Sequence, residues 1–128
     1  GTGGSLEAVG SAVAVVNSIL WNNTREIATG AGGTVSVAWS LAPETVTGDN
    51  LIAQDPLFVR GPGEVFGTDP NLALQAGSSA VDSGNNNLIP EGLGGTDAAG
   101  MSRRRDDATV ADSGEGDAPI VDRGALER

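Results

Sequence analysis

The sequence contains no histidine, cysteine, lysine or tyrosine, and these absences exclude several kinds of active site. Without histidine or cysteine, the chain cannot build a Ser-His-Asp triad, a cysteine nucleophile or a His/Cys zinc site. Without lysine it cannot form a Schiff base, and without cysteine it has no disulfide. Only carboxylates, hydroxyls, amides and arginine remain for chemistry. We therefore expect a protein without catalytic activity of its own.

Large aromatic side chains and long apolar runs are also scarce. The 128 residues include two tryptophans, two phenylalanines and 20 glycines, and most apolar residues are Ala, Val, Leu or Ile. Small and β-branched side chains suit thin, stacked strands better than helices packed through large side chains. This composition favours an all-β chain. No apolar run approaches the ~18 residues that a membrane-spanning helix requires.

The charge of the chain is strongly unbalanced. The net charge is −10, and all seven basic residues are arginines. A surface this acidic repels phosphate backbones and anionic lipid headgroups. We therefore expect neither nucleic acid as a partner nor insertion into a membrane.

Two segments share an alternating pattern. From Thr34 to Leu41, apolar residues occupy every second position, which is typical of a strand with one buried face. The earlier segment 13–19 has a similar pattern, with Ser18 equivalent to Ser40. Turn-forming residues separate the two segments, at 22–24 and 29–33. A repeat of about this length predicts a solenoid in which strands of successive repeats stack in register.

The pattern changes along the second half of the chain. Apolar runs at 50–59 and 71–81 each follow turn formers, at 47–49 and 67–70. Residues 85–117 are rich in Gly, Asn, Asp and Ala, which predicts long loops. The last apolar pairs, Ile120-Val121 and Ala125-Leu126, are expected to return and close the end of the core.

Five short motifs, in the same order, resemble the C-terminal region of secreted bacterial parallel β-helix proteins of the choice-of-anchor Q type. Residues 17–23 read NSILWNN and residues 55–59 read DPLFV, which are similar to the family's NSILWGN and DPLFV elements. Residues 71–84, NLALQAGSSAVDSG, resemble YRLQPGSPAIDAG. Residues 97–103, DAAGMSR, keep the Asp, Gly and Arg spacing of DLDGNPR, and residues 121–127, VDRGALE, resemble VDIGAYE.

The resemblance implies a right-handed parallel β-helix and export to the cell surface or the extracellular space. On this basis we expect β-helix rungs over residues 1–68, then a final rung and a loop-rich C-terminal cap over residues 69–128. The expected partners are preceding β-helix rungs or other copies of the chain.

Four aspartates lie in or beside these motifs, where turns are expected. A carboxylate beside a turn can accept hydrogen bonds from nearby backbone N–H groups. We therefore predict that Asp55, Asp82, Asp97 and Asp122 fasten turns. Asp97 and Arg103 could also pair across the loop of the cap, which would add only ~0–1 kcal/mol at an exposed position.

Two groups of residues are candidates for binding. Asp112, Glu115 and Asp117 place oxygen ligands at spacings that suit either a calcium loop or a flexible acidic loop. No other cofactor is expected. Trp21 follows a strand and precedes a turn, so it is the candidate for stacking on a sugar, whereas Trp39 belongs to the alternating pattern and is expected in the core.

Three functions are compatible with these features. The first is a non-catalytic structural or interaction module of an exported β-helix protein, which could self-assemble. The second is a carbohydrate-binding module that contacts extracellular polysaccharide through Trp21. The third is a fragment of a polysaccharide lyase or glycosidase. It requires at least three acidic residues on one flank, and the sequence does not indicate such a cluster. The sequence favours the first.

Overall fold

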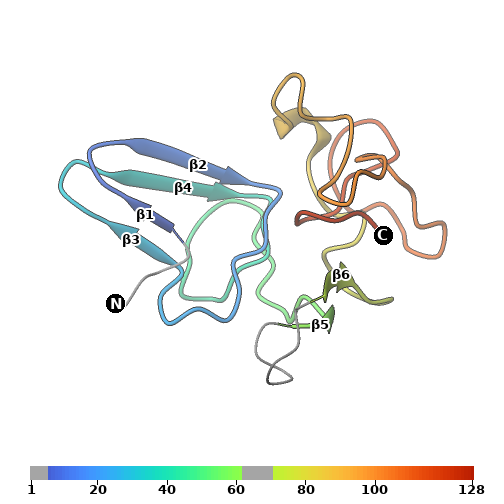
Figure 1. The fold of residues 1–128 in the computed structure, drawn as a ribbon, viewed down its shortest axis with the longest axis horizontal. Helices are drawn as coiled ribbons and strands as arrows, with labels where there is room; N and C mark the ends of the chain where they lie inside the picture. The colour runs from blue at the N-terminus through green and yellow to red at the C-terminus, as the bar shows by residue number, and fades with distance from the viewer. Residues whose placement is uncertain (1–5, 62–70) are drawn as a thin grey trace.

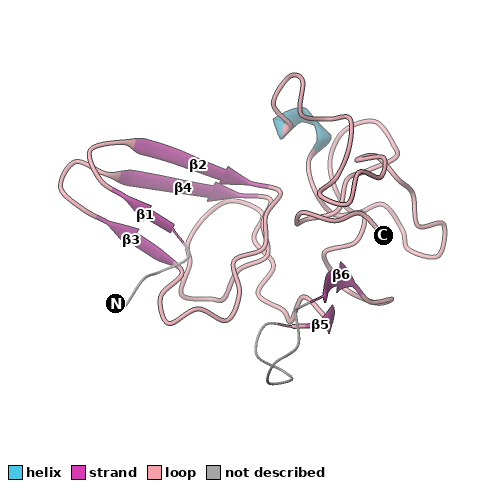
Figure 2. Cartoon of the chain, viewed as in Figure 1, coloured by secondary structure: helices cyan, strands magenta, loops and turns pink. Residues whose placement is uncertain are grey.

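The computed structural model describes residues 6–61 and 71–128 and shows an all-β chain (Figure 2). Its strands are β1 (Leu6–Ala8), β2 (Ala12–Val16), β3 (Ile27–Thr29), β4 (Thr34–Ala38), β5 (Phe58–Arg60) and β6 (Asn71–Leu74). The described residues contain a single short 3-10 helix, η1 (Asn86–Leu88), and none of their helices could cross a membrane. The predicted turn at 67–70 and the predicted boundary between residues 68 and 69 lie outside the described residues.

The first four strands form two stacked layers, β1 with β2 and then β3 with β4, and the strands of the two layers pair in parallel. β1 pairs with β3, with Leu6 opposite Ile27, and β2 pairs with β4, with Ala12 opposite Thr34. Figure 1 shows the chain bending back between β1 and β2, and again between β3 and β4, so that the second bend lies beside the first. The predicted equivalence of Ser18 with Ser40 is confirmed, and the N–H of Ser18 donates to Oγ of Ser40 at 3.2 Å.

Residues 49–52 form a third layer. They follow the second layer after about half as many residues as separate the first layer from the second. Asp49 pairs with Ala38, and Ile52 pairs with Leu41, in both cases in parallel. The N–H of Asp49 donates to the carbonyl of Val37 at 3.0 Å. Gly48 permits this approach, because a Cβ atom at that position would lie only 2.1 Å from the Val37 carbonyl oxygen. The spacing of the sequence repeat therefore ends after the second layer.

The three layers turn at equivalent positions. Asn17, Trp39 and Asn50 all have positive φ angles, of 47°, 48° and 51°. Asparagine adopts this conformation more readily than most residues, whereas tryptophan rarely does. The strand predicted from Thr34 to Leu41 therefore ends at Ala38. The alternation of exposed Thr34 and Ser36 with more buried Val35 and Val37 is confirmed, but it stops before Trp39.

The parallel pairing of strands ends with β4, and the second half has only an isolated parallel bridge among the described residues, between Asn85 and Glu115. β5 and β6 pair in the antiparallel direction, Phe58 with Leu74. Only the short segment 61–70 connects them. A parallel crossover generally needs about a dozen residues or more, so a connection of this length favours a hairpin. Of the apolar run at 71–81, only Asn71–Leu74 forms a strand, β6, and its pairing is antiparallel rather than parallel.

From Gln75 to Arg128 the chain consists almost entirely of turns and loops, as predicted for residues 85–117. These loops fold against a core of Leu41, Leu74, Ala80 and Val81, which joins the two halves of the chain. Ile120 and Val121 return to the interior with 2% and 0% exposure, which confirms the predicted closure of the core. Ala125, by contrast, is exposed, and Leu126 is half-buried.

Candidate functional site

One side of the strand β2 has no partner strand among residues 6–61 and 71–128. β2 is hydrogen-bonded to β4 alone within its sheet. The N–H of Thr34 donates to the carbonyl of Ser11 at 3.0 Å, and Thr34 is in register with Ala12. In a parallel pair, alternate residues of a strand face the same neighbour. The backbone groups of Ser11, Val13 and Val15 therefore face β4, and those of Ala12 and Ala14 face away from it.

We call these outward backbone groups of Ala12 and Ala14, together with the N–H of Val16, the β2 edge. The strand sequence is AVAVV, so it contains no charged residue and no proline. Proteins commonly protect exposed strand edges with charges, prolines or bulges, because an open edge pairs with other strands. The β2 edge has none of these within the strand and is therefore suited to accept another strand.

Two of the predicted turn aspartates, Asp55 and Asp97, accept hydrogen bonds from backbone N–H groups. Asp55 lies before β5, and Asp97 lies in the C-terminal loops. The carboxylate of Asp55 accepts from the N–H of Leu57 at 2.8 Å. Asp97 is buried and accepts from the N–H groups of Ala99 and Met101 at 2.8 Å, and from that of Glu127 at 3.0 Å. The bond from Glu127 is the largest of the backbone contributions that lower the pKa of Asp97.

The other two, Asp82 and Asp122, lie in the interior with 0% exposure. Asp122 fastens two segments, because one of its oxygens accepts from the N–H of Asp82 and the other from that of Arg128, both at 2.8 Å. The side chain of Asp82 is less well satisfied. Its Oδ2 accepts from the N–H of Asp107 at 3.3 Å, and its Oδ1 is buried with no hydrogen-bond partner. Burial, together with the nearby charge of Asp122, raises the pKa of Asp82 to about 6.

Arg123 connects the last segment to the stacked layers, a role that the sequence did not indicate. Its side chain is buried, and it donates to the carbonyls of Ser83 and Ser40 at 2.9 Å and of Asn50 at 2.7 Å. The guanidinium also lies 5.7 Å from the centre of the Trp39 ring. Burial lowers the pKa of Arg123 to about 10, so the group is charged at neutral pH.

Arg103 faces a different carboxylate from the one predicted. Its Nε lies 3.3 Å from Oε1 of Glu127, and the predicted ion pair with Asp97 does not form. The contact with Glu127 is not a well-formed hydrogen bond, because Oε1 has no partner of suitable geometry. Burial therefore outweighs the nearby positive charge and raises the pKa of Glu127 to about 8.

The raised pKa of Glu127 predicts a decrease in stability between pH 6 and 8. In this range the folded chain holds a proton on Glu127 that the unfolded chain, with a pKa near 4.5, has lost. The free energy of unfolding should therefore fall as pH rises, by at most about 1.4 kcal/mol per unit, and Glu127→Gln should flatten the curve. Urea unfolding in a chelator at each pH measures this. Glu115→Gln, at an exposed position, should keep the slope, and a wild-type curve that is flat or rising would contradict the assignment.

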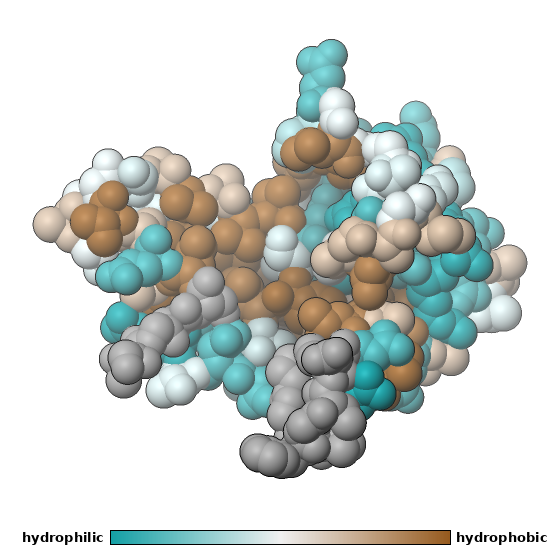
Figure 3. Space-filling view, in the orientation of Figure 1, coloured by the Kyte–Doolittle hydropathy of each residue, from teal (hydrophilic) through white to brown (hydrophobic). Residues whose placement is uncertain are grey.

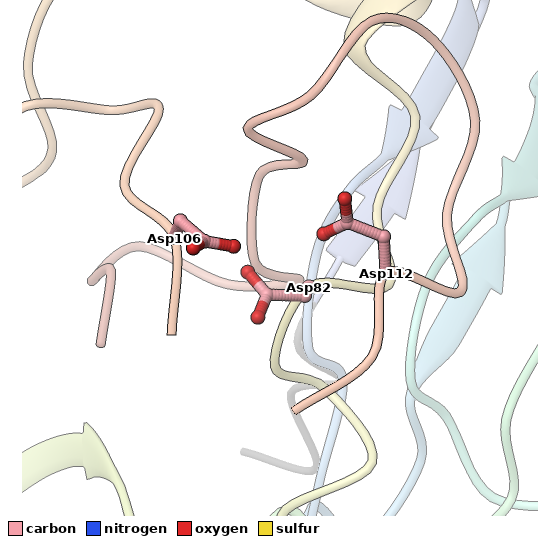
Figure 4. A group of neighbouring side chains, drawn as sticks. All are labelled: Asp82, Asp106 and Asp112. Carbon is pink, nitrogen blue, oxygen red and sulfur yellow. The ribbon is translucent and has the colours of Figure 1, made fainter. Parts of the chain in front are cut away.

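The predicted calcium loop is not brought together as a unit. The carboxylate of Glu115 accepts from the side chain of Asn85, and the carbonyl of Asp117 accepts from that of Asn86. Asp112 instead lies beside Asp82 and Asp106, and one carboxylate oxygen from each lies within 4.8 Å of the others. Figure 4 shows the carboxylate of Asp82 directed between the other two. We call these three residues the aspartate cluster.

Trp21 and Trp39 are both half-buried. Trp21 packs against the core cluster that contains Leu41 and Leu74, and it borders an open cleft of about 430 Å³ formed with residues 22–26, Pro43 and Thr45. Trp39 lies under Arg123 rather than continuing the alternation of β4. Trp21 is thus the tryptophan that borders a cleft, but part of its surface is used in the core.

Comparisons of the chain with protein-family models, with curated proteins and with solved structures find no match in any of the three.

A hollow lined by apolar side chains separates the strand layers from the C-terminal loops (Figure 3). It contains two neighbouring clefts, of about 330 and 290 Å³, which share Val16, Asn17, Arg103 and Ala125. Leu72 and Leu93, which also line them, are 41% and 67% exposed. The hollow adjoins the C-terminal end of β2, so a strand bound at the β2 edge would reach it.

Proposed function

We propose that this chain is a non-catalytic structural and interaction module whose β2 edge binds another β-strand. In this proposal β1 and β2 belong to one rung of a right-handed parallel β-helix, β3 and β4 belong to the next rung, and the C-terminal loops form its cap. The register of the parallel pairs, Leu6 with Ile27 and Ala12 with Thr34, supports the rung interpretation. Each pair joins segments one repeat apart, as in the successive coils of a solenoid. On the other side of β4, the third layer pairs with Ala38 at the end of the strand.

The single observation that carries the proposal is the β2 edge itself. Its N–H and C=O groups are spaced as a template for a further strand, and β2 has neither charge nor proline to prevent pairing. Binding by strand addition gains main-chain hydrogen bonds and depends little on side-chain chemistry.

The partner is a strand of a preceding β-helix rung or of another copy of the chain. For the 128-residue chain in isolation, the β2 edge of a second copy can supply this strand, and β2 is one of the two longest described strands. The net charge of −10 opposes this association at long range, but β2 itself is uncharged. Salt screens repulsion between exposed charges over about 10 Å at 0.1 M. Self-association should therefore strengthen as ionic strength rises.

Export to the cell surface is part of the same proposal and rests on the motif resemblance. Glycan binding through Trp21 is the alternative. It has less support, because the ring contributes to the core next to Leu41 as well as bordering a cleft.

A proline at residue 14 tests the role of the β2 edge. Proline removes a backbone N–H, and at Ala14 this group faces away from β4, so Ala14→Pro should block strand addition while the β2–β4 ladder remains. We expect the wild-type chain to give a concentration-dependent dimer or higher oligomer in light scattering after size exclusion, and Ala14→Pro to be monomeric with a similar circular dichroism spectrum.

Ala14→Ser is the matched control, because it keeps the N–H group, and it should associate like the wild type. Equal association of the proline variant and the wild type would contradict strand addition at this edge. A wild-type chain that is monomeric at all concentrations and ionic strengths would contradict self-association.

A further inference from the structure

The aspartate cluster is a second feature, separate from the β2 edge, that points to a ligand. Asp82 belongs to the buried turn that follows Val81, whereas Asp106 and Asp112 are exposed on the loop that covers it. Figure 4 shows the three carboxylates converging from these two segments. The described part of the chain has no other group of three or more acidic residues this close together.

The state of Asp82 distinguishes the cluster from ordinary surface acids. Its side chain has 0% exposure, its Oδ1 has no hydrogen-bond partner, and one of its carboxylate oxygens lies within 4.8 Å of one from each of Asp106 and Asp112. A buried carboxylate oxygen without a partner is costly, and such groups are normally paired or bound to a metal. The neighbouring negative charges increase this cost, and a cation placed between the three carboxylates would offset it.

We propose that Asp82, Asp106 and Asp112 bind a divalent cation, Ca²⁺, which fixes the C-terminal loop onto the core. Calcium binds oxygen ligands at roughly 2.3–2.6 Å, so two oxygens on one ion can lie up to about 5 Å apart. The three carboxylate oxygens lie within 4.8 Å of one another, which fits this limit. A set made only of oxygens suits calcium better than zinc, which prefers nitrogen and sulfur.

Only one residue of the proposed site belongs to the calcium loop that the sequence suggested. Asp112 is shared, but Glu115 and Asp117 are replaced by Asp82 and Asp106. Asp82 comes from a different motif, far from Asp112 in the sequence, so a search for closely spaced acids cannot find the three together. The ion would thus connect distant segments rather than organise a single loop.

The test is calcium binding by the full 128-residue chain. We expect calorimetric titration with CaCl₂ to give an apparent Kd of roughly 0.1–1 mM, the range of extracellular calcium modules. Thermal unfolding should occur several degrees higher in calcium than in chelator, with NaCl added to equal ionic strength so that charge screening is the same. Asp106→Asn and Asp112→Asn should each weaken binding at least tenfold.

Both substitutions are at exposed positions, so the variants should fold even if Asp82→Asn does not. Asp117→Asn is the matched control and should bind like the wild type. Loss of binding in Asp117→Asn together with normal binding in Asp106→Asn would overturn the assignment in favour of the contiguous loop. No calcium-dependent change in the wild type, or an equal change in the Asp106→Asn/Asp112→Asn double variant, would also overturn it.

Discussion

Replacing Arg123 by alanine should destabilise the folded chain by about 3–5 kcal/mol. The side chain supplies three hydrogen bonds to the carbonyls of Ser40, Asn50 and Ser83, all from a buried guanidinium. Removing the donor takes a partner from each of these acceptors, although the carbonyl of Ser40 still accepts from the N–H of Ile52, and it removes the contact with the Trp39 ring. The cost is reduced in part because the variant no longer buries a charge. Urea denaturation followed by circular dichroism measures the difference.

Two further variants, Arg123→Lys and Arg104→Ala, separate the hydrogen bonds of Arg123 from the effect of removing any arginine. Lysine carries the charge but lacks the planar fork that reaches several carbonyls, so Arg123→Lys should recover only part of the stability. Arg104 is exposed, and Arg104→Ala should change stability by less than about 0.5 kcal/mol. An Arg123→Ala variant within about 1 kcal/mol of the wild type would show that Arg123 does not join the two halves of the chain.

Adding a single methyl group at Gly48 should cost about 3 kcal/mol or more, a large effect for so small a change. The Cβ of Gly48→Ala would lie 2.1 Å from the carbonyl oxygen of Val37, and backbone at that distance must move. The movement would break the bonds that Asp49 makes to Val37 and Trp39, and these bonds attach the third layer to β4. Thermal unfolding of the variant measures the loss.

Gly95→Ala provides the control, because a Cβ there would meet no atom within 4 Å and Gly95 has no positive φ. Its stability should be equal to that of the wild type or slightly higher, since alanine reduces the freedom of the unfolded chain. If Gly48→Ala were tolerated equally well, the close packing of the third layer against β4 would be wrong.

The stacking of the first two layers could be predicted from the sequence because it depends on local patterns. The alternation in Thr34–Ala38 and the equivalence of Ser18 with Ser40 are both visible as a repeat, and the structure has the same register. The loop-rich character of residues 85–117 was also predictable, because their composition offers little apolar surface to bury. These features require no knowledge of distant contacts.

The third layer and the candidate sites could not be predicted, because they depend on contacts that no local pattern encodes. The shorter spacing that brings Asp49 and Ile52 onto the second layer breaks the repeat. Arg123 stands at an apolar position of the family motif, and its buried role depends on the carbonyls of Ser40 and Asn50, which are distant in the sequence. Asp82 likewise has the local setting of a turn aspartate, while the loop that faces it comes much later in the chain.

Amide hydrogen exchange, resolved residue by residue along β2, tests the central claim most directly. The amides of Val13 and Val15 face β4 and should be protected at every protein concentration. The amides of Ala12 and Ala14 face the β2 edge and should exchange rapidly in dilute solution, then become protected as the chain associates. Protection of Ala12 and Ala14 that does not change with concentration would contradict the account, as would fast exchange in an oligomer, because the β2 edge would then not be where a second strand binds.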